Sequence, residues 1–363
     1  MSKRRLSKKF WNPNVNKLSP YTPGEQPKEN NYIKLNTNEN PDAPSKKVKK
    51  AIFDNLKNNK SDLRLYPDPH SKELKNAIAK NFKVKSENIF VGNGSDEVLA
   101  FCFHAFFSKR GKLAIPEITY SFYPSLAKLF EVDISVIKIS EEFSVNLNHI
   151  DSTTNSVLLP NPNATTGKNL TRKYIESFLL KNPKKIFVID EAYVDYGTES
   201  CIPLIKKYHN ILVVQTFSKS RGLAGIRLGF VIGNESLIEA LNRVKNSFNS
   251  YPVDRLASIA GIASLSDKDW FNSNRKKVIK NREFLTKELV KIGFKVIPSK
   301  GNFILASHSS YRAKKIFEEL KKRKILIRVF KDFKIRNWVR ITVGSFNDCK
   351  KLLDELSSLV INS

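Results

Sequence analysis

Polar side chains that could carry covalent and acid–base chemistry follow three apolar segments of this 363-residue chain. Lys219 comes just after one such segment, Asp190 ends another, and Asn163 lies in the loop after a third. A lysine amine can form a Schiff base with an aldehyde, and a carboxylate stabilises a nearby cation. The three residues therefore predict a site where an amine and a carboxylate act on the same bound molecule.

The residues close to Lys219 in sequence predict a binding site for an anion. Thr216 and Ser218 place hydroxyls before the lysine, glycines follow it, and Arg227 comes eight residues later. Hydroxyls and an arginine fork suit an anionic group such as phosphate. A second glycine-rich turn, at residues 92–94, opens a helix whose first amides could also bind phosphate. On the lysine stretch alone, a surface turn with one solvated lysine is the competing interpretation.

Buried strands that alternate with helices must position these side chains. We expect strands at residues 88–91, 112–115, 135–139, 156–159, 186–190, 211–215 and 227–233. We expect helices at residues 45–58, 71–82, 98–107, 235–248, 270–292, 311–323 and 347–359. This alternation predicts an α/β fold with a mostly parallel sheet and helices on both faces.

The spacing of the three polar residues matches this sheet. Asp190 follows Asn163 by 27 residues, and Lys219 follows Asp190 by 29, about the length of one strand–helix unit. Because active sites of such folds form at the carboxyl ends of the strands, we expect the three side chains along one sheet edge.

The sequence predicts an N-terminal arm followed by two domains. Residues 1–31 are polar and contain prolines, which predicts an extended arm lying on its own domain or on a partner subunit. Residues 32–255 predict the large domain that carries the sheet. Residues 256–363 are more highly charged and predict a smaller α+β domain at the C-terminus.

Composition narrows the class of protein. A hydrophobic content of 40% suits a globular core, and no apolar run reaches the ~18 residues of a membrane helix. The cysteines, Cys102, Cys201 and Cys349, are far apart, which predicts neither disulfides nor a metal site and fits the reducing cytoplasm. The basic N-terminus lacks an apolar core, so we do not expect a secretory signal.

The net charge of +28 would also suit a nucleic-acid-binding protein, which is the alternative from a different class. The lysines, however, are spread along the whole chain, and no RNA- or DNA-binding module accompanies them. We therefore expect no nucleic-acid partner. The same positive field would steer a phosphate-bearing substrate toward the protein.

A lysine, a carboxylate, an amide and a phenol around an anion site are the groups that pyridoxal 5′-phosphate requires. The chain resembles the aminotransferases of the aspartate-aminotransferase-like fold (fold type I), and within them the histidinol-phosphate aminotransferase family. The resemblance covers nearly the whole chain and rests on residues 10–11, 19–24, 35–41, 66–69, 92–97, 216–229 and 339–344.

The resemblance implies a role for each matching residue. Lys219 would form the Schiff base and carry the proton, and Asp190 would pair with the protonated pyridine nitrogen. Asn163 and Tyr193 would hold the phenolic oxygen of the cofactor. The other expected cofactor contacts are Gly94, Ser95, Asp96, Tyr120, Thr216, Ser218 and Arg227, with Tyr66 from the other subunit of a homodimer.

The resemblance also implies a substrate pair. Arg340 would bind the carboxylate of glutamate or 2-oxoglutarate, and Arg328 and Tyr21 would contact histidinol phosphate. The implied reaction converts L-histidinol phosphate and 2-oxoglutarate to imidazole acetol phosphate and L-glutamate in histidine biosynthesis. An aromatic amino-acid aminotransferase and a threonine-phosphate decarboxylase of the same fold are the alternatives.

One residue departs from the family pattern. The loop of Asn163 usually reads Pro-Asn-Ala-Pro-Thr-Gly or Pro-Asn-Asn-Pro-Thr-Gly, and Thr165 replaces the second proline here. Because a rigid turn residue is lost, we expect slower or looser chemistry, but not its absence.

Overall fold

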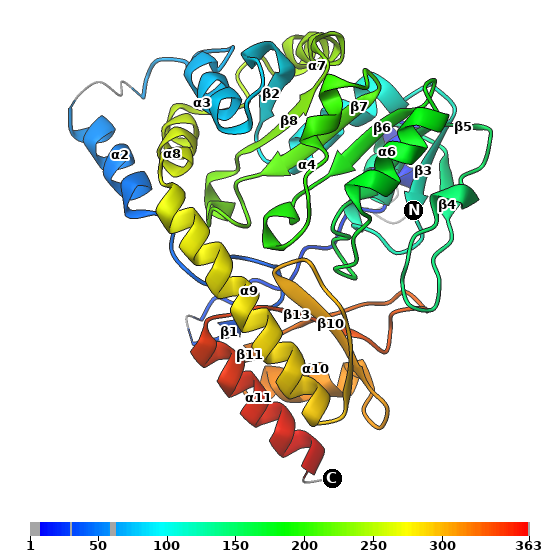
Figure 1. The fold of residues 1–363 in the computed structure, drawn as a ribbon, viewed down its shortest axis with the longest axis vertical. Coiled ribbons are helices and arrows are strands. Elements are labelled where there is room, and N and C mark those ends of the chain that lie inside the picture. The colour runs from blue at the N-terminus through cyan, green and yellow to red at the C-terminus, as the bar shows by residue number, and fades with distance from the viewer. Residues whose placement is uncertain (1–7, 30, 59–62, 362–363) are drawn as a thin grey trace.

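The computed structural model describes residues 8–29, 31–58 and 63–361 (Figure 1). The first seven residues, part of the N-terminus that we expect not to be a secretory signal, lie outside these ranges. The large domain is built on a seven-stranded sheet with the order β2-β8-β7-β6-β5-β3-β4. All neighbouring strands are parallel except β8, which runs antiparallel to β2 and β7. The mostly parallel sheet predicted from the sequence is confirmed.

The strands of this sheet are β2 (Ile89–Gly92), β3 (Lys112–Pro116), β4 (Ile134–Ile137), β5 (Thr154–Pro160), β6 (Ile186–Asp190), β7 (Ile211–Thr216) and β8 (Gly229–Gly233). The helices around it are α2 (Lys46–Lys57), α3 (Lys72–Phe82), α4 (Ser95–Cys102), α5 (Phe122–Leu129), α6 (Arg172–Lys181), α7 (Glu235–Phe248) and α8 (Arg255–Ser266).

The sheet is buried on both faces because its strands contribute to two cores. In β7, Ile211 and Val213 pack in one core, and Leu212 and Val214 pack in the other. A strand sends successive side chains to opposite faces, so a continuous apolar run fills both. Helices α3, α6 and α8 cover the first face, and α4, α5 and α7 cover the second.

The second domain contains a four-stranded antiparallel sheet, β12-β13-β10-β9, packed against three helices. Its elements are α9 (Lys268–Lys291), β9 (Phe294–Ile297), β10 (Phe303–His308), α10 (Ala313–Lys322), β11 (Ile325–Leu326), β12 (Arg328–Val329), β13 (Val339–Thr342) and α11 (Phe346–Ile361). The short strand β1 (Ile33–Lys34) pairs with β11, so a segment from the start of the chain joins this domain.

The change from one core to the other comes later than residue 255. Helix α8 packs Ala257, Ala260 and Leu265 into the core of the large domain. Helix α9 instead contributes Val278 and Leu285 to the core of the second domain. Helix α8 therefore shares the core of the large domain and α9 shares the core of the second domain, to which β1 is also joined.

The described part of the arm lies on the large domain of its own chain. Asn14 Nδ2 donates to Glu131 Oε1 at 2.5 Å, and Lys128 Nζ donates to Ser19 Oγ at 3.0 Å. At the end of the arm, the ring of Tyr21 packs edge-on against Tyr120, with 5.9 Å between the centroids. The arm therefore forms one wall above the sheet edge.

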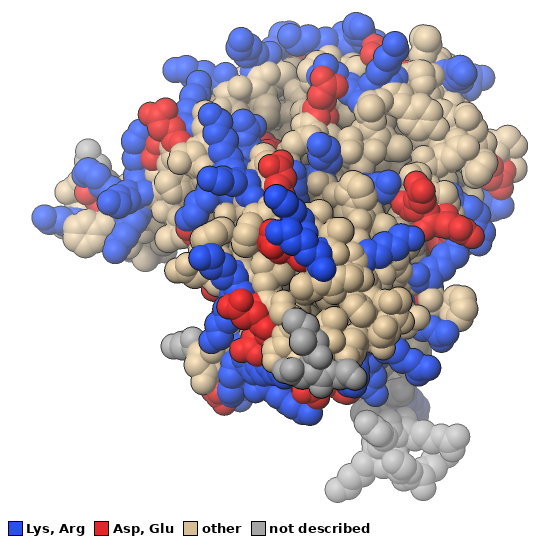
Figure 2. Space-filling view, turned by 60° about the horizontal axis from the view of Figure 1, so that its bottom comes forward, with Lys and Arg blue, Asp and Glu red and all other residues tan. Residues whose placement is uncertain are grey.

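The surface carries its charge in a dispersed form. Figure 2 shows lysines and arginines scattered over one face, with acidic side chains between them. The described helices include none that is long and apolar enough to cross a membrane. The basic side chains on this face are thus dispersed and do not form one basic stripe.

Candidate active site

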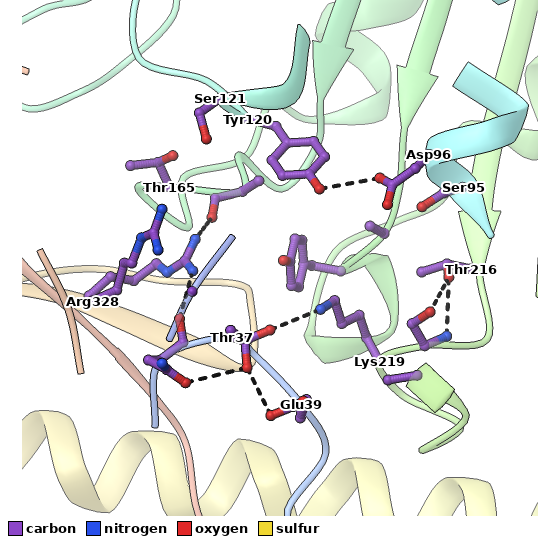
Figure 3. A pocket seen from close by; sticks show the side chains of 18 of the residues that line it. Thr37, Glu39, Ser95, Asp96, Tyr120, Ser121, Thr165, Thr216, Lys219 and Arg328 are labelled. Atoms are coloured by element: carbon purple, nitrogen blue, oxygen red, sulfur yellow. Dashed lines mark hydrogen bonds between the residues drawn. The ribbon is translucent and has the colours of Figure 1, made fainter. Parts of the chain in front are cut away.

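A cavity of about 380 Å³ lies where the carboxyl ends of β6 and β7 face the second domain (Figure 3). Strands β5, β6 and β7 are neighbours in the sheet, as the spacing of the polar residues predicted. Most of the candidate residues line this cavity: Tyr21, Ser95, Asp96, Tyr120, Asp190, Tyr193, Thr216, Ser218, Lys219, Arg227, Arg328 and Arg340. Three candidates, Gly94, Asn163 and Tyr66, are not among the lining residues.

Lys219 lies three residues after the end of β7 and is held at both ends by one segment of the chain. Its Nζ donates to the backbone oxygen of Thr37 at 3.2 Å, and its own backbone oxygen accepts from Asn40 Nδ2 at 3.0 Å. Its Nζ also lies 5.7 Å from the ring centroid of Tyr193. The amine is therefore fixed inside the cavity beside a phenol.

Asp190 is the last residue of β6, and its carboxyl is buried. Tyr123 donates its hydroxyl to Asp190 Oδ2 at 2.7 Å, and the backbone N–H of Ala192 donates to Oδ1 at 3.1 Å. Burial raises the pKa of Asp190 to about 6, although these two hydrogen bonds act in the opposite direction. A cation brought to this carboxyl would stabilise its ionised form.

We expect the cofactor-free protein to lose stability as the pH rises from 5 to 8, in part because of Asp190. Its folded pKa of about 6 lies above the ordinary 3.8, so the folded protein holds a proton that the unfolded chain releases. This contribution is complete below about pH 3.8 and is lost as the pH rises through 6. The expected loss over this interval is roughly 1–2 kcal/mol.

Urea denaturation of the wild type and of Asp190→Asn at several pH values measures this contribution. Glu191, whose pKa burial raises to about 7, is present in both proteins, so its effect cancels in the difference. Hydrogen bonds weakened by the substitution change stability equally at every pH. Parallel stability curves for the two proteins would contradict the expectation.

The groups that we expect to bind an anion lie at the start of α4. Arg227 Nη2 is 3.3 Å from Asp96 Oδ2, and Thr216 Oγ1 lies 3.0 Å from Ser218 Oγ. Gly94 precedes α4 with φ of +85°, and a Cβ there would lie 2.7 Å from Arg227 Nη2. Only glycine therefore leaves space between the arginine and the first amides of the helix, which suits a phosphate group.

Two arginines meet at the other end of the cavity. Arg328 on β12 and Arg340 on β13 are paired across the two strands. Arg340 Nη1 donates to the backbone oxygen of Ala164 at 2.8 Å, whereas its buried Nε has no hydrogen-bond partner among the described residues. Burial lowers the pKa of Arg340. In the described part of the chain, neither arginine forms an ion pair with a carboxylate, so the pair favours an anionic ligand.

Asn163 is not among the residues that line the cavity, and its contact with the cofactor stays a prediction. Its Oδ1 accepts from the backbone N–H groups of Thr165 and Thr166 at 2.9 and 3.1 Å, and its Nδ2 donates to the backbone oxygen of Ile118 at 2.8 Å. The amide oxygen therefore closes its own loop, whereas the NH₂ group ties the loop to the segment after β3 and keeps a second N–H. Ala164, the next residue, lines the cavity in its place.

Thr165 compensates in part for the missing proline. Its hydroxyl donates to the backbone oxygen of Thr119 at 2.9 Å, which ties the loop to the segment that carries Tyr120. The expected loosening of this loop is opposed by that bond and by the bonds of Asn163.

Tyr66 lies away from the cavity of its own chain. Its side chain is 79% exposed, and its ring stacks on Tyr251 with 4.7 Å between the centroids. This placement leaves the phenol free to meet another molecule.

The sequence interpretation missed residues in the segment before α2. Asn38 Nδ2 donates to the hydroxyl of Tyr193 at 3.0 Å, and Glu39 lines the cavity. Burial opposes the ionisation of Glu39, but hydrogen bonds from Lys34 and Thr37 hold its pKa below the ordinary value. The polar motif at residues 36–40 was the available signal, since it belongs to the resemblance although no role was assigned to it.

The family model and two relatives that match this chain bear the name aminotransferase. Residues 30–356 match the model of the family described as aminotransferase class I and II. The chain is 47% identical over 352 residues to the histidinol-phosphate aminotransferase of Clostridium acetobutylicum, covering 97% of this chain and 99% of the relative. It is 46% identical over 356 residues to the protein of the same name from Brachyspira hyodysenteriae, covering 98% and 100% of the two chains.

Solved structures share the fold. The histidinol-phosphate aminotransferase of Sinorhizobium meliloti, solved in complex with pyridoxal-5′-phosphate, superposes with a TM-score of 0.88. The superposition covers 97% of this chain and 98% of that one, at 20% sequence identity. The type I fold implied by the resemblance is therefore confirmed.

Proposed function

The chain belongs to the class I and II aminotransferase family, and we propose that it transfers an amino group from L-histidinol phosphate to 2-oxoglutarate. The products are imidazole acetol phosphate and L-glutamate, as a step of histidine biosynthesis. The observation that carries this proposal is the near full-length identity to curated relatives that bear the name of this reaction. A cavity with an amine at its centre and cationic groups at both ends supports it.

Enzymes of this family use pyridoxal 5′-phosphate, and the cavity fits it on its own chemistry. The turn at Gly94 leaves room for a phosphate between α4 and Arg227, since a Cβ would fill that space. The carboxyl of Asp190 is buried without a bonded cation in the described part of the structure, which suits a protonated ring nitrogen. When bound, the cofactor supplies an aldehyde for the amine and a ring that takes up electrons.

We assign the chain's own groups the following actions. Lys219 would hold the cofactor covalently and would move a proton at the substrate carbon that bears the amine. Asp190 would keep the ring nitrogen protonated, and Tyr193 would donate to the phenolic oxygen. The backbone of residues 94–96, with Thr216, Ser218 and Arg227, would hold the phosphate, and Tyr120 would cover the ring.

Both substrates use the arginine pair. Arg340 binds a carboxylate or phosphate by two parallel hydrogen bonds, and Arg328 neutralises the second negative charge. Arg328 Nη2 also donates to the backbone oxygen of Thr22 at 3.0 Å, next to Tyr21 on the arm. The arm therefore lies against the substrate end of the cavity.

We further propose a cytoplasmic homodimer in which Tyr66 of each chain reaches the cofactor phosphate of the other. The support is an exposed apolar surface near Tyr66, which includes Leu65, Phe248 and Tyr251 at 52%, 81% and 42% exposure. Light scattering should give a mass twice the 41.5 kDa of the chain. A fully active species with the mass of one chain would rule the shared site out.

One comparison of substrates tests the proposed function. The purified holoenzyme is given histidinol phosphate, phenylalanine or threonine phosphate as amino donor, with 2-oxoglutarate as acceptor. We expect the highest kcat/KM for histidinol phosphate and no release of carbon dioxide from threonine phosphate. Preference for phenylalanine, or decarboxylation of threonine phosphate, would replace the proposal by one of the two alternatives of the same fold.

A further inference from the structure

In the proposed function, the hydroxyl of Tyr193 donates to the phenolic oxygen of the cofactor. Asn163 Nδ2 donates one of its two hydrogens to the backbone oxygen of Ile118, so Tyr193 is one of two possible donors. Tyr193 lines the cavity, with Lys219 Nζ 5.7 Å from its ring centroid. The direction in which the Tyr193 hydroxyl points its proton therefore matters for the cofactor.

Asn38 fixes that direction. This residue is 1% exposed, and its Nδ2 donates to the Tyr193 hydroxyl at 3.0 Å. The orientation of its amide is set by Thr342, because the Thr342 hydroxyl donates to Asn38 Oδ1 at 3.1 Å and accepts from the Asn38 backbone N–H at 2.9 Å. An amide whose oxygen is occupied in this way can present only its NH₂ to Tyr193.

A phenol that accepts a hydrogen bond from an amide keeps its own proton free to donate. Among the described residues, the Tyr193 hydroxyl has no other hydrogen-bond partner. We propose that Asn38 is a positioning residue, which donates to Tyr193 so that the tyrosine directs its own proton to the phenolic oxygen of the cofactor. This inference rests on the proposed function, since it requires bound pyridoxal 5′-phosphate.

The arrangement also ties the cofactor to the second domain. Asn302, in the turn before β10, donates from Nδ2 to the backbone oxygen of Asn38 at 3.0 Å, and Thr342 ends β13. Asn38 is thus held by two segments of the second domain while its side chain bonds a tyrosine of the large domain. A displacement of the second domain would weaken the hydrogen bond to Tyr193.

The inference predicts a spectroscopic change. A donor to the phenolic oxygen takes up part of the negative charge of that oxygen, so the oxygen stabilises the protonated, cationic form of the lysine–cofactor linkage less. Loss of the donor should therefore raise the pKa of the linkage, which is read from the absorbance of the holoenzyme as the pH is varied. A hydrogen bond to a charged group corresponds to about one to two pH units in that titration.

Two substitutions at Asn38 distinguish an effect of the hydrogen bond to Tyr193 from an effect of side-chain packing. Asn38 has φ of +57°, which asparagine, aspartate and glycine adopt more readily than alanine. Asn38→Asp presents an acceptor to Tyr193 and reverses the hydrogen bond, whereas Asn38→Gly removes the bond. We expect the midpoint of the absorbance titration of the holoenzyme to rise by about one pH unit or more in Asn38→Asp and by less in Asn38→Gly.

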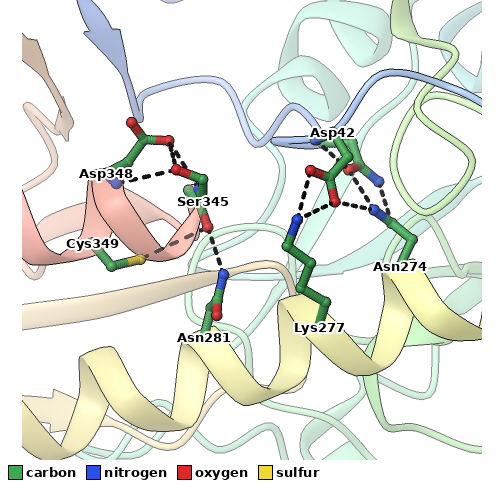
Figure 4. A network of polar contacts seen from close by, with 9 residues as sticks. Asp42, Asn274, Lys277, Asn281, Ser345, Asp348 and Cys349 are labelled. Atoms are coloured by element: carbon green, nitrogen blue, oxygen red, sulfur yellow. Dashed lines mark hydrogen bonds and ion pairs between the residues drawn. The ribbon is translucent and has the colours of Figure 1, made fainter.

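Tyr193→Phe and the double variant Asn38→Gly/Tyr193→Phe complete the experiment. Because Asn38 acts through Tyr193, the double variant should titrate like Tyr193→Phe alone. Asn281→Ala is the matched control, since it removes a buried asparagine hydrogen bond to the Gly344 backbone oxygen (Figure 4). The control should lower thermal stability and leave the midpoint at the wild-type pH.

The outcomes distinguish the inference from the proposed function. If Tyr193→Phe shifts the midpoint but both Asn38 variants titrate like the wild type, Asn38 does not position the tyrosine. Additive shifts in the double variant would also overturn the inference. If the wild type shows no absorbance band that borohydride abolishes, cofactor binding itself is contradicted, and with it the proposed function.

Discussion

Replacing Lys219 with alanine is expected to lower turnover of histidinol phosphate by about four orders of magnitude or more. Lys219 is the lysine that lines the cavity in the described structure, and its Nζ lies near the phenol of Tyr193. The substitution removes both the covalent attachment and the group that moves the proton. Single-turnover rates measure the loss, and the absorbance band that borohydride abolishes in the wild type should be absent.

A lysine on the surface serves as the control for this experiment. Lys72, the first residue of α3, is exposed, and Lys72→Ala should retain wild-type rates and absorbance. Turnover by Lys219→Ala within tenfold of the wild type would exclude the lysine from both actions and leave the cavity without an assigned nucleophile.

Replacing Arg340 with glutamine is expected to lower kcat/KM for 2-oxoglutarate by about 10²- to 10³-fold. The guanidinium is held by the backbone oxygens of Ala164 and Asn36, without a carboxylate partner in the described structure. An anionic substrate would therefore supply the charge that this partly buried cation lacks. Losing one partner of a buried charged pair costs about 2–5 kcal/mol, and the expected 10²- to 10³-fold change, about 3–4 kcal/mol, lies within that interval.

A nearby arginine provides the matched control for Arg340→Gln. Arg336 is exposed and packs its guanidinium over the ring of Phe333 at 4.4 Å. Arg336→Gln should therefore leave both substrates unaffected. An unchanged KM for 2-oxoglutarate in Arg340→Gln would show that the carboxylate binds elsewhere.

The sheet and the sheet edge that carries the site were predictable because buried strands have a strong local signal. Strand β7 begins with an unbroken apolar run rich in β-branched residues, and a short run of this kind favours a strand covered on both faces. Once β5, β6 and β7 are placed in order, the residues that follow them must meet at one edge. Helix α7 was predicted with the bounds that the structure shows, since its apolar residues form one clear stripe.

Elements without a local pattern could not be predicted. Helix α8 buries small residues such as Ala257, Ala260 and Gly261, so it shows no strong amphipathic stripe. Strand β1 has only two residues, and its partner β11 lies near the other end of the chain. No window of sequence around either element contains the information that determines it.

The orientation of the side chains in the site could likewise not be predicted from the local sequence. The type of residue and the motif placed Asn163 in the correct loop, but the direction of its amide depends on bonds to Ile118, Thr165 and Thr166. Asn38 was overlooked because its partners, Tyr193 and Thr342, are distant in sequence. Residue type therefore predicted which groups approach the site, whereas their orientation required the fold.

The pairing of β1 with β11 has a consequence for synthesis of the chain on the ribosome. Ile33 is made early, but its strand partner Ile325 is made near the end. At typical rates of translation the segment waits about 15–60 s for its partner. During that interval the large domain can form its sheet, but the segment that holds Lys219 has no second domain to anchor it. The last part of the nascent chain to appear is thus the part that completes the catalytic centre.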